Sequence, residues 1–247
     1  MDLSGKTAVV TGAASGIGRA TAREFGRCGA DVALFDVDGD GANRLAVELE
    51  GSGCRAFAFA FDLRDRAQLG GAFEAVHERF GRIDALANVA AIYPRAHVKD
   101  VTEEFWDRVI SVDLRAAFFC CQDALRVMEA QGSGSIVNVA SGTAFRPIAG
   151  LAVYAAAKAG VVGMSRVLAL EYARKGIRVN VVAPGHTSPD VESEDGSTAD
   201  WAAAEQLVPG RYMAPDESAN AIVWLCSDAA SGVNGAIVNV NGGNYMP

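Results

Sequence analysis

Three side chains of this sequence have the chemistry and the spacing to exchange a proton with an alcohol or a ketone. Tyr154 and Lys158 stand four residues apart in an alanine-rich stretch that favours a helix, so both side chains share one helix face. Because a cation beside a phenol favours the phenolate, we expect Lys158 to lower the Tyr154 pKa from about 10 toward neutral pH. Ser141 lies thirteen residues before the tyrosine, where its hydroxyl is available to hold the reacting oxygen. Chance alone supplies such a Tyr–Lys pair roughly one time in twelve. The pair by itself is therefore weak evidence for an active site, and the surrounding elements must support it.

Short β-rich runs alternate with amphipathic helical patterns along the chain, and this order predicts a parallel sheet covered on both faces. Strands are predicted at Thr7–Thr11, Asp31–Asp36, Arg55–Phe61, Ile83–Asn88, Ser135–Ala140, Ile177–Val182 and Ala236–Val240. Helical patterns include Arg19–Cys28, Gln68–Phe80, Glu103–Ala130, Tyr154–Arg174 and Pro215–Cys226. We therefore expect an α/β fold, a Rossmann-like doubly wound sheet of seven parallel strands, in a single domain over residues 1–247.

Composition and charge limit the partners and the location. With 247 residues, half of them hydrophobic and 21% charged, the chain is long enough for one domain with a large core. A net charge of −8 repels nucleic acid and anionic membranes, so a small-molecule substrate is favoured. Five cysteines without a Cys-x-x-Cys indicate reduced core residues and a cytoplasmic location, and the three histidines form no metal-ligand pattern. Without a signal segment, and with no apolar run approaching membrane-spanning length, we expect neither a secreted nor a membrane-integral protein.

The first predicted strand runs into a glycine-rich turn that opens a helix. Its candidate cofactor-binding residues are Gly12, Ser15, Gly16, Ile17 and Gly18. Glycines let the backbone approach a pyrophosphate at a helix N-terminus, although they also serve tight packing of a strand against a helix. Asp36 ends the second strand, where a carboxylate accepts hydrogen bonds from ribose hydroxyls and repels a 2′-phosphate. We therefore expect NAD rather than NADP, with a helix cap as the alternative role of Asp36.

Taken in order, these motifs resemble those of the short-chain dehydrogenase/reductase family of the common single-domain type, over nearly the whole chain. The glycine turn matches Thr-Gly-x-x-x-Gly-x-Gly, Asn88-Val89-Ala90-Ala91 matches the segment after the fourth strand, and Gly242-Gly243 matches a terminal glycine pair. The resemblance implies that Ser141, Tyr154 and Lys158 form the catalytic set. It also implies cofactor contacts from Asp62, Leu63, Asn88, Ala90, Tyr154, Lys158, Pro184, Gly185 and Thr187.

The activity that the resemblance implies agrees with the chemistry of the residues. Tyr154 would pass a proton to or from the substrate oxygen while hydride moves between the substrate carbon and the nicotinamide. Ser141 would orient the substrate, and Lys158 would bind the nicotinamide ribose. We therefore expect an NAD-dependent oxidoreductase that interconverts a secondary alcohol and a ketone. Two alternatives stay open: a 3-oxoacyl-carrier-protein reductase-like enzyme, which Asp36 and the net charge of −8 disfavour, and a catalytically weak NAD-binding sensor or scaffold.

The sequence departs from the family pattern at three places. Val89 and Ala91 replace an asparagine and a glycine of the family, which should change only the fit of side chains. Asp113 stands where the family usually has an asparagine that helps to hold a water behind the catalytic lysine. Our hypothesis is that its charge makes Tyr154 a weaker acid and moves the optimum for oxidation to higher pH; alternatively, Asp113 faces solvent or pairs with Arg115 or Arg108. Pro189 replaces a threonine that contacts the carboxamide, and Thr187 or Ser188 is the expected substitute.

The substrate pocket is expected in loops beyond the strand ends. Residues 186–210 are acidic and rich in turn formers, which is typical of a substrate loop or lid. The expected pocket residues are Tyr93, Pro94, Arg95, Phe145, Arg146, His186, Trp201 and Met213, together with Ser141 and Tyr154. Aromatic and aliphatic walls with one or two arginines suit a cyclic or medium-sized secondary alcohol, with or without a polar or anionic substituent. Helices Glu103–Ala130 and Tyr154–Arg174 are apolar beyond the needs of one face and predict an oligomer; the resemblance implies a homotetramer.

Overall fold

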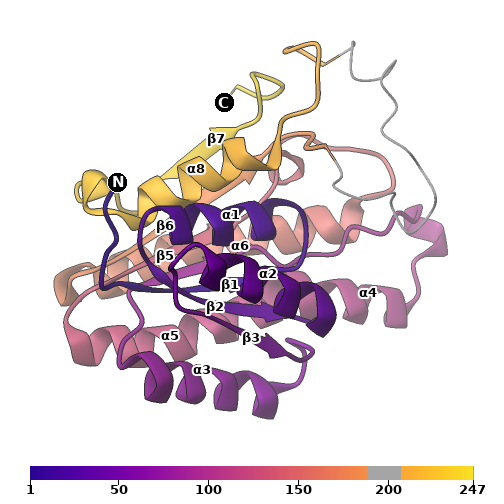
Figure 1. The fold of residues 1–247 in the computed structure, drawn as a ribbon. Coiled ribbons are helices and arrows are strands. Elements are labelled where there is room, and N and C mark those ends of the chain that lie inside the picture. Colours follow the sequence, from indigo (N-terminus) through magenta and orange to yellow (C-terminus); the bar gives the residue numbers. More distant parts are fainter. Residues whose placement is uncertain (189–206, 247) are drawn as a thin grey trace.

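The computed structural model of the chain describes residues 1–188 and 207–246 (Figure 1). The strands are β1 (Thr7–Thr11), β2 (Asp31–Asp36), β3 (Ala56–Ala60), β4 (Ala85–Asn88), β5 (Gly134–Val139), β6 (Ile177–Pro184) and β7 (Ile237–Val240). The helices are α1 (Gly16–Arg27), α2 (Gly39–Gly51), α3 (Arg66–Phe80), α4 (Glu103–Ile110), α5 (Ala117–Gln131), α6 (Ala152–Tyr172) and α8 (Pro215–Cys226). Short helical segments are η1 (Val98–Asp100), η2 (Ser111–Ala116), η3 (Gly142–Ala144), η4 (Ala173–Lys175) and η5 (Asp228–Ala230).

The strands form one parallel sheet in the order β3-β2-β1-β4-β5-β6-β7, so the predicted α/β fold of seven parallel strands is confirmed. β1 and β2 have the predicted bounds, and the other strands differ by one or two residues at an end. The largest differences are at β4, which begins at Ala85 rather than Ile83, and at β6, which continues to Pro184. Every residue of β1 is buried, as expected for a central strand between two helical layers.

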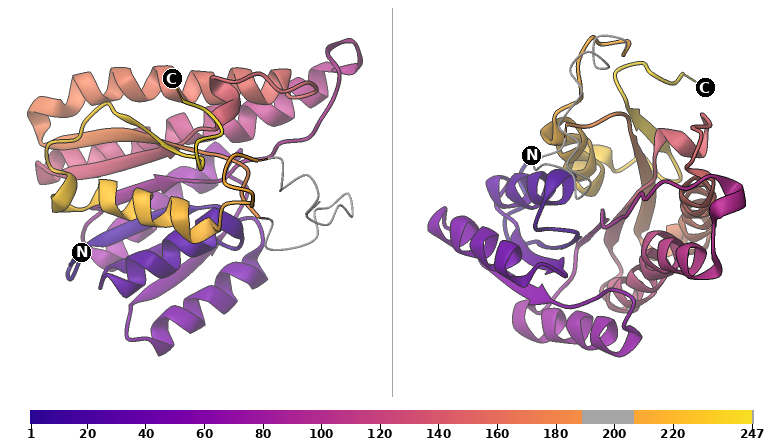
Figure 2. Two further views of the ribbon diagram at one scale, coloured as in Figure 1. Left: turned by 90° about the horizontal axis from the view of Figure 1, so that it is seen from above. Right: turned by 90° about the vertical axis from the view of Figure 1, so that its right-hand side faces the viewer.

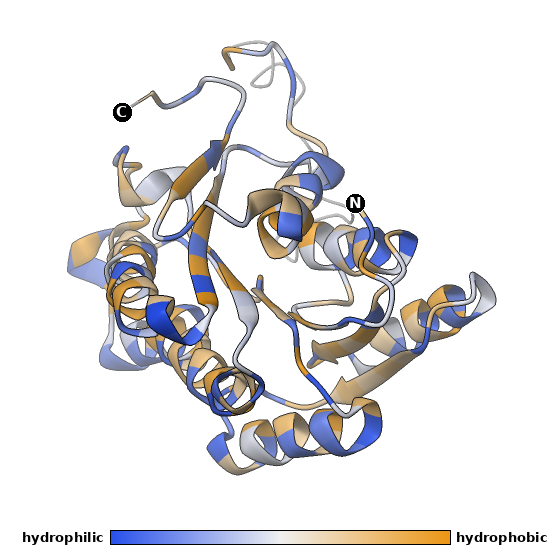
Figure 3. Ribbon diagram, turned by 90° about the vertical axis from the view of Figure 1, so that its left-hand side faces the viewer, coloured by the Kyte–Doolittle hydropathy of each residue, from blue (hydrophilic) through white to orange (hydrophobic). Residues whose placement is uncertain are grey.

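Helices cover the sheet on both faces. α1, α2 and α8 lie on one face, and α3, α5 and α6 lie on the other (Figure 2). The side chains of successive residues in β1 point to opposite faces of the sheet. Val9 therefore packs in the core on the α3 side, whereas Ala8 and Val10 pack in the core beneath α1. Figure 3 shows the apolar strands in the middle and polar residues on the outer sides of the helices. α2 was not among the predicted helices.

The predicted helix Glu103–Ala130 is helical throughout but not uniform. α4 passes directly into η2, which is a π-helical segment, and η2 passes into α5. A π turn shifts the side chains that follow it out of the register of an α-helix, and such turns occur frequently at functional sites. Asp113 lies in this segment and is 1% exposed, whereas Arg115, two residues later, is exposed. A carboxylate of the π-helical segment thus lies in the core.

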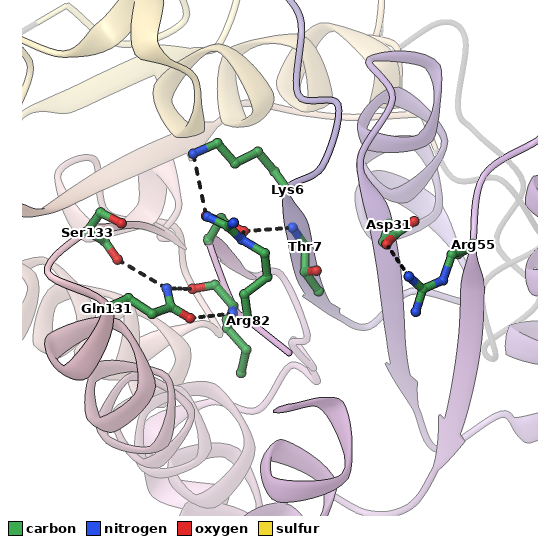
Figure 4. Close-up of polar contacts among 9 residues, drawn as sticks. Lys6, Thr7, Asp31, Arg55, Arg82, Gln131 and Ser133 are labelled. Atoms are coloured by element: carbon green, nitrogen blue, oxygen red, sulfur yellow. Dashed lines mark hydrogen bonds and ion pairs between the residues drawn. The ribbon is translucent and has the colours of Figure 1, made fainter. Parts of the chain in front are cut away.

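The amino ends of the strands are joined by a polar network (Figure 4). The buried Asp84 accepts two hydrogen bonds of 2.6 Å from Arg82 and one of 2.9 Å from the N–H of Thr7, and it also pairs with Lys6 at 3.6 Å. These contacts tie the start of β1 to the start of β4. They lie at the edge of the sheet opposite the predicted functional residues, which identifies them as structural.

α6 carries two of the predicted catalytic residues, Tyr154 and Lys158. Together with η4 it spans Ala152–Lys175, which is long and apolar enough to cross a membrane, so the expectation that no apolar run reaches that length is wrong. This helix packs against β5 and β6, however, and its Ala157, Val161 and Ala169 are buried. The core helix of a soluble protein has the same length and composition, and α6 is such a helix.

Candidate active site

The predicted functional residues come together where the parallel strands end. β1 ends at Thr11, which is paired with Phe35 of β2 on one side and with Asn88 of β4 on the other. From β1 the chain adds β2 and β3 on one side of the sheet and then β4 to β7 on the other side. Open α/β sheets bind ligands at such a switch point. β5 and β6 end at the same edge and are followed by Ser141 and Gly185.

The glycine-rich turn after β1 has the shape of a cradle. A Cβ atom at Gly12 would lie 2.8 Å from the Cα of Ala90, and one at Gly18 would lie 1.9 Å from the Gly12 carbonyl oxygen, so both positions require glycine. Above Gly16, by contrast, nothing lies within 4 Å of a built Cβ, and its φ is +50°. The first turn of α1 has no acidic residue and no side-chain cap, which leaves its N–H groups available to an anion. The turn therefore fits a pyrophosphate. The remaining predicted turn residues are the exposed Ser15 and the half-buried Ile17.

Asp36 stands at the rim of this cradle. Its Oδ2 accepts a hydrogen bond of 2.8 Å from the N–H of Ala14, and its Oδ1 accepts one of 2.9 Å from the N–H of Asp38. The residue that caps α2 is Asp38, whose side chain accepts from the N–H of Gly41 at 2.9 Å. The alternative that Asp36 is a helix cap is therefore wrong. Its carboxylate is bound to the turn itself and stays half-buried.

Three other predicted cofactor-binding residues, Asp62, Leu63 and Asn88, have different surroundings. Asp62 and Leu63 follow β3 and are half-buried. Asp62 is paired with Arg64 at 2.5 Å, and this hydrogen-bonded guanidinium holds the pKa of the carboxyl below its usual value. Asn88 is buried, and its amide donates a hydrogen bond of 2.8 Å to the side chain of Asn138. The Asn88 amide thus also ties β4 to β5.

Ser141, Tyr154 and Lys158 converge beyond the end of β5. The ammonium of Lys158 donates a hydrogen bond of 3.1 Å to the carbonyl of Val139 and lies 5.6 Å from the centroid of the Tyr154 ring. Ser141 begins η3, and its Oγ accepts a hydrogen bond of 3.2 Å from the N–H of Thr143. A side-chain hydrogen bond also joins Ser141 and Tyr154. The three side chains therefore form one contiguous group.

Asp113 belongs to the same group. Its Oδ2 lies 3.7 Å from the ammonium of Lys158, and its Oδ1 accepts a hydrogen bond of 2.9 Å from the N–H of Ile92. The alternative in which Asp113 faces solvent or pairs with Arg115 or Arg108 is wrong. Burial raises the pKa of Asp113 to about 6 even though the charge of Lys158 opposes the shift. The ammonium of Lys158 at 3.7 Å favours the ionised form of this carboxylate.

The electrostatics of Tyr154 correct one expectation from the sequence. Burial raises the pKa of Tyr154 above its ordinary value, and the charge of Asp113 raises it further, whereas the hydrogen bond with Ser141 lowers it. The expectation that Lys158 brings this pKa down toward neutral pH is therefore wrong here, because burial and then the charge of Asp113 raise the pKa. Burial and a compensating charge cannot be inferred from a Tyr–Lys spacing.

Aromatic residues of two loops lie over the catalytic group. The ring of Tyr93, which follows β4, packs edge to face on Tyr154 with 6.2 Å between centroids. Phe145, which follows η3, stacks on Tyr245 with 5.4 Å between centroids and an angle of 12°. Tyr245 was not predicted, because a single aromatic residue near the C-terminus carries no signal of its position. Trp201 lies outside the described residues.

Basic residues gather at the same mouth. Arg146 donates a hydrogen bond of 3.0 Å to the carbonyl of Asn244. Burial lowers the pKa of His186, and the positive charges of Arg146 and Arg95 lower it further, which places all three groups within electrostatic reach of one another. Arg95 is exposed and forms no ion pair within residues 1–188 and 207–246. This part of the mouth therefore has a positive potential.

The turn after β6 is closely packed. Pro184 ends the strand, and a Cβ atom at Gly185 would lie 2.8 Å from the Cα of Asn241, so no larger residue fits. Thr187 bridges to Met213, and its hydroxyl donates a hydrogen bond of 3.3 Å to the carbonyl of Gly185. The predicted residues Pro184, Gly185 and Thr187 thus lie together at the strand edge.

A doubly wound sheet with a glycine cradle at its switch point, and a Ser–Tyr–Lys group beside the cradle, defines a nicotinamide-dependent oxidoreductase. The family profile described as Enoyl-(Acyl carrier protein) reductase matches residues 12–244. Cis-4-hydroxycyclohexanecarboxylate dehydrogenase of Sinomonas cyclohexanicum is 43% identical over 240 residues, with 96% of each chain covered. D-threitol dehydrogenase of Mycolicibacterium smegmatis is 40% identical over 244 residues, which are 98% of this chain and 93% of the relative. The crystal structure of levodione reductase is 33% identical, covers 98% of both chains and has a TM-score of 0.91.

The chain belongs to the short-chain dehydrogenase/reductase family, as its motifs predicted. It is a soluble Rossmann-fold enzyme that acts on alcohol groups or on the corresponding carbonyls.

Proposed function

We propose that this protein interconverts a secondary alcohol and a ketone with NAD, with Tyr154 as the general acid and base. The observation that carries the proposal is the convergence of Ser141, Tyr154 and Lys158 at the strand edge that also holds the glycine cradle. A sensor or scaffold would need the cradle but not this group, so that alternative is disfavoured.

In alcohol oxidation, the hydroxyl of Ser141 binds the substrate oxygen and Tyr154 accepts its proton; in ketone reduction, Tyr154 returns a proton to the same oxygen. The bound dinucleotide supplies the hydride acceptor or donor. Lys158 is held by the Val139 carbonyl, where its ammonium is available to the ribose hydroxyls of the nicotinamide half. Tyr93 covers one side of the Tyr154 ring and limits the access of water.

We assign NAD rather than NADP because of Asp36. Its carboxylate is fixed at the rim of the cradle by the N–H groups of Ala14 and Asp38, where it is available to ribose hydroxyls. A 2′-phosphate in the same place would bring two negative charges together, and the two N–H groups leave the carboxylate little freedom to turn away.

For the substrate, we favour a cyclic secondary alcohol with an anionic substituent. Arg95 and Arg146 supply a positive mouth beside His186, and the rings of Tyr93 and Phe145 supply flat apolar walls. One relative is named cis-4-hydroxycyclohexanecarboxylate dehydrogenase, and the substrate in that name is a cyclic secondary alcohol with a carboxylate. A guanidinium pairs with a carboxylate through two parallel hydrogen bonds, which fixes the orientation of a small ring.

A carrier-protein reductase is the second candidate, because the matching family profile is described as an acyl-carrier-protein reductase. The net charge of −8 disfavours it, since an acidic carrier protein would be repelled. Asp36 disfavours it as well, insofar as such an enzyme uses NADP.

We further propose a cytoplasmic homotetramer of single-domain subunits, with residues 186–210 as the substrate loop. An apolar hollow between α4, η2, α5 and α6 is suited to contact a second copy. Its lining residues are Ile110, Leu114, Arg115, Phe118, Phe119, Gly160 and Met164. Trp106, one helical turn before Ile110, is 46% exposed, which is unfavourable for a monomer in water.

The substrate proposal is tested by measuring NADH formation with cis-4-hydroxycyclohexanecarboxylate, cyclohexanol and threitol. We expect kcat/KM to be at least about tenfold higher for the carboxylate than for cyclohexanol, since one charge-assisted pair contributes about 1.5–3 kcal/mol. Arg146→Gln should remove most of this preference through KM and leave cyclohexanol turnover unchanged. Arg55→Gln, which changes an exposed arginine paired with Asp31 at the opposite edge of the sheet, is the matched control. Equal kcat/KM values for the two alcohols would refute the anionic substituent. Tight NAD binding without turnover of any alcohol would favour the sensor.

A further inference from the structure

We propose that Asp113 is a positioning residue that pairs with Lys158 and keeps a proton on Tyr154 in the free enzyme, so that ketone reduction is favoured at neutral pH and alcohol oxidation in alkaline solution. The inference rests on the proposed function, because it concerns the proton that Tyr154 exchanges with substrate. The asparagine that the family usually has at this place is neutral, and it would leave Lys158 as an uncompensated charge.

The geometry of the pair supports this assignment. The side chains of Asp113 and Lys158 are 0% and 2% exposed, and 3.7 Å separates Oδ2 from Nζ. Oδ1 is anchored by the N–H of Ile92 at 2.9 Å. Oδ2 accepts no hydrogen bond from the residues that the structure describes, so its charge is directed at the ammonium alone. The ammonium is held in turn by the carbonyl of Val139 at 3.1 Å.

The groups packed around the pair determine the local charge. α6 contributes Tyr154 and Lys158, and the segment after β4 contributes Tyr93, whose ring packs on that of Tyr154. Arg115 of the same π-helical segment is exposed and donates instead to a backbone carbonyl near α3 at 3.3 Å. With Asp113 ionised and Lys158 protonated, the buried group has no net charge. With an asparagine in place of Asp113, it would carry one positive charge.

The directions of the pKa shifts agree with this balance. Burial lowers the pKa of Lys158, and Asp113 opposes that shift, so the carboxylate helps the lysine to keep its proton. Burial and then the charge of Asp113 raise the pKa of Tyr154. A neutral phenol is therefore the form present in the free enzyme at neutral pH.

The protonation state of Tyr154 selects the direction of the reaction. In reduction, hydride adds to the carbonyl carbon, the phenol proton moves to the carbonyl oxygen, and the resulting phenolate regains a proton from solvent. In oxidation, the alcohol gives its proton to the phenolate while hydride would pass from the carbon to the oxidised dinucleotide. Since a neutral phenol already carries its proton and cannot take up that of the alcohol, oxidation requires a pH at which Tyr154 loses its proton.

The test is Asp113→Asn, which removes the charge and keeps an acceptor for the N–H of Ile92. The ionisation of Tyr154 is followed in the cofactor-free protein by the carbon-13 NMR signal of the phenol carbon, assigned with Tyr154→Phe. Without the charge of Asp113, loss of the phenol proton leaves a phenolate that is compensated by the ammonium of Lys158. We therefore expect the midpoint of the Tyr154 titration to fall by at least about one pH unit. The pH at half-maximal kcat/KM for oxidation should fall with it, so that oxidation at neutral pH rises roughly tenfold.

Asp123→Asn is the matched control, because Asp123 is also a buried aspartate, 4% exposed and paired with Arg66 and Arg126 away from the site. It should leave both midpoints unchanged. An unchanged Tyr154 midpoint in Asp113→Asn overturns the proposal. If that variant does not fold, the wild-type titration decides, and a Tyr154 midpoint below the ordinary value of about 10 overturns the proposal. The NMR titration needs no turnover, so a failure of the proposed activity is distinguishable from a failure of this inference.

Discussion

Removing the charge of Asp36 should change the choice between NAD and NADP. The carboxylate ends β2 and binds the glycine turn through the N–H of Ala14 at 2.8 Å. In Asp36→Asn an amide oxygen still accepts that hydrogen bond, so the shape of the turn is retained. The variant therefore isolates the charge from the structure that holds it.

Two contributions to selectivity change together. Hydrogen bonds from ribose hydroxyls to a charged acceptor are worth about 1.5–3 kcal/mol, against about 1 kcal/mol for a neutral one. Repulsion between a half-buried carboxylate and a 2′-phosphate is about 1.7 kcal/mol per unit charge, for a separation of about 5 Å and an effective dielectric constant of about 40. The substitution thus weakens the ribose hydrogen bonds by about 1 kcal/mol and removes about 1.7 kcal/mol of repulsion. Together these two changes amount to about 2.7 kcal/mol, which corresponds to roughly a hundredfold fall in the ratio of kcat/KM for NAD to that for NADP.

Initial rates with both cofactors, at one saturating alcohol concentration, give this ratio directly. The matched control is Asp38→Asn, because Asp38 caps α2 only two residues away and should affect the stability of that helix rather than the ratio. A ratio that changes less than about threefold in Asp36→Asn would refute the argument from charge. An equal fall of the NAD to NADP ratio in Asp38→Asn would refute it too, since that result would show a general effect of the turn between β2 and α2.

Three further changes have specific expected outcomes. Gly18→Ala would bring a Cβ to 1.9 Å from the Gly12 carbonyl oxygen, so NAD affinity measured by calorimetry should fall more than tenfold. Hydrogen bonding with Arg211 holds the pKa of Glu217 at about 2, below its unperturbed 4.5. Glu217→Gln should therefore lower the Tm at neutral pH, and the difference from wild type should vanish as the pH falls from about 4.5 to 2. Phe118→Asp, at a side chain that is 42% exposed on the proposed interface, should yield a smaller species in analytical ultracentrifugation with an unchanged circular dichroism spectrum.

The framework of the fold could be predicted because its central strands are buried on both faces. Asp31–Asp36 is a continuous apolar run between polar ends, and such runs have clear bounds in a sequence. The helix Gly39–Gly51 is harder to find, because glycines at its start and end have a low helix propensity and only Leu45, Ala46 and Leu49 form a clear apolar face. The exact alternation of buried strands and helices, rather than any single helix, predicted the parallel sheet.

The identity of the catalytic residues could be predicted, but their electrostatics could not. The spacing of Tyr154 and Lys158 is a local property of one helix. The burial of Lys158, and its pairing with Asp113 from a different helical segment, depend on tertiary packing, which a spacing within one helix does not reveal. The contact between Phe145 and Tyr245 joins residues a hundred positions apart. Contacts of this kind are set by tertiary packing.

Alcohol-dependent NADH formation by Tyr154→Phe tests the proposed mechanism most directly. The variant removes the proton donor and acceptor but retains the ring on which Tyr93 packs, so NAD binding should persist while kcat/KM falls by about 10²–10⁴. Tyr93→Phe is the matched control, since its hydroxyl has no assigned part in proton transfer, and it should lose less than about tenfold. If Tyr154→Phe retained activity comparable to that of Tyr93→Phe, Tyr154 would not be the general acid and base of this enzyme.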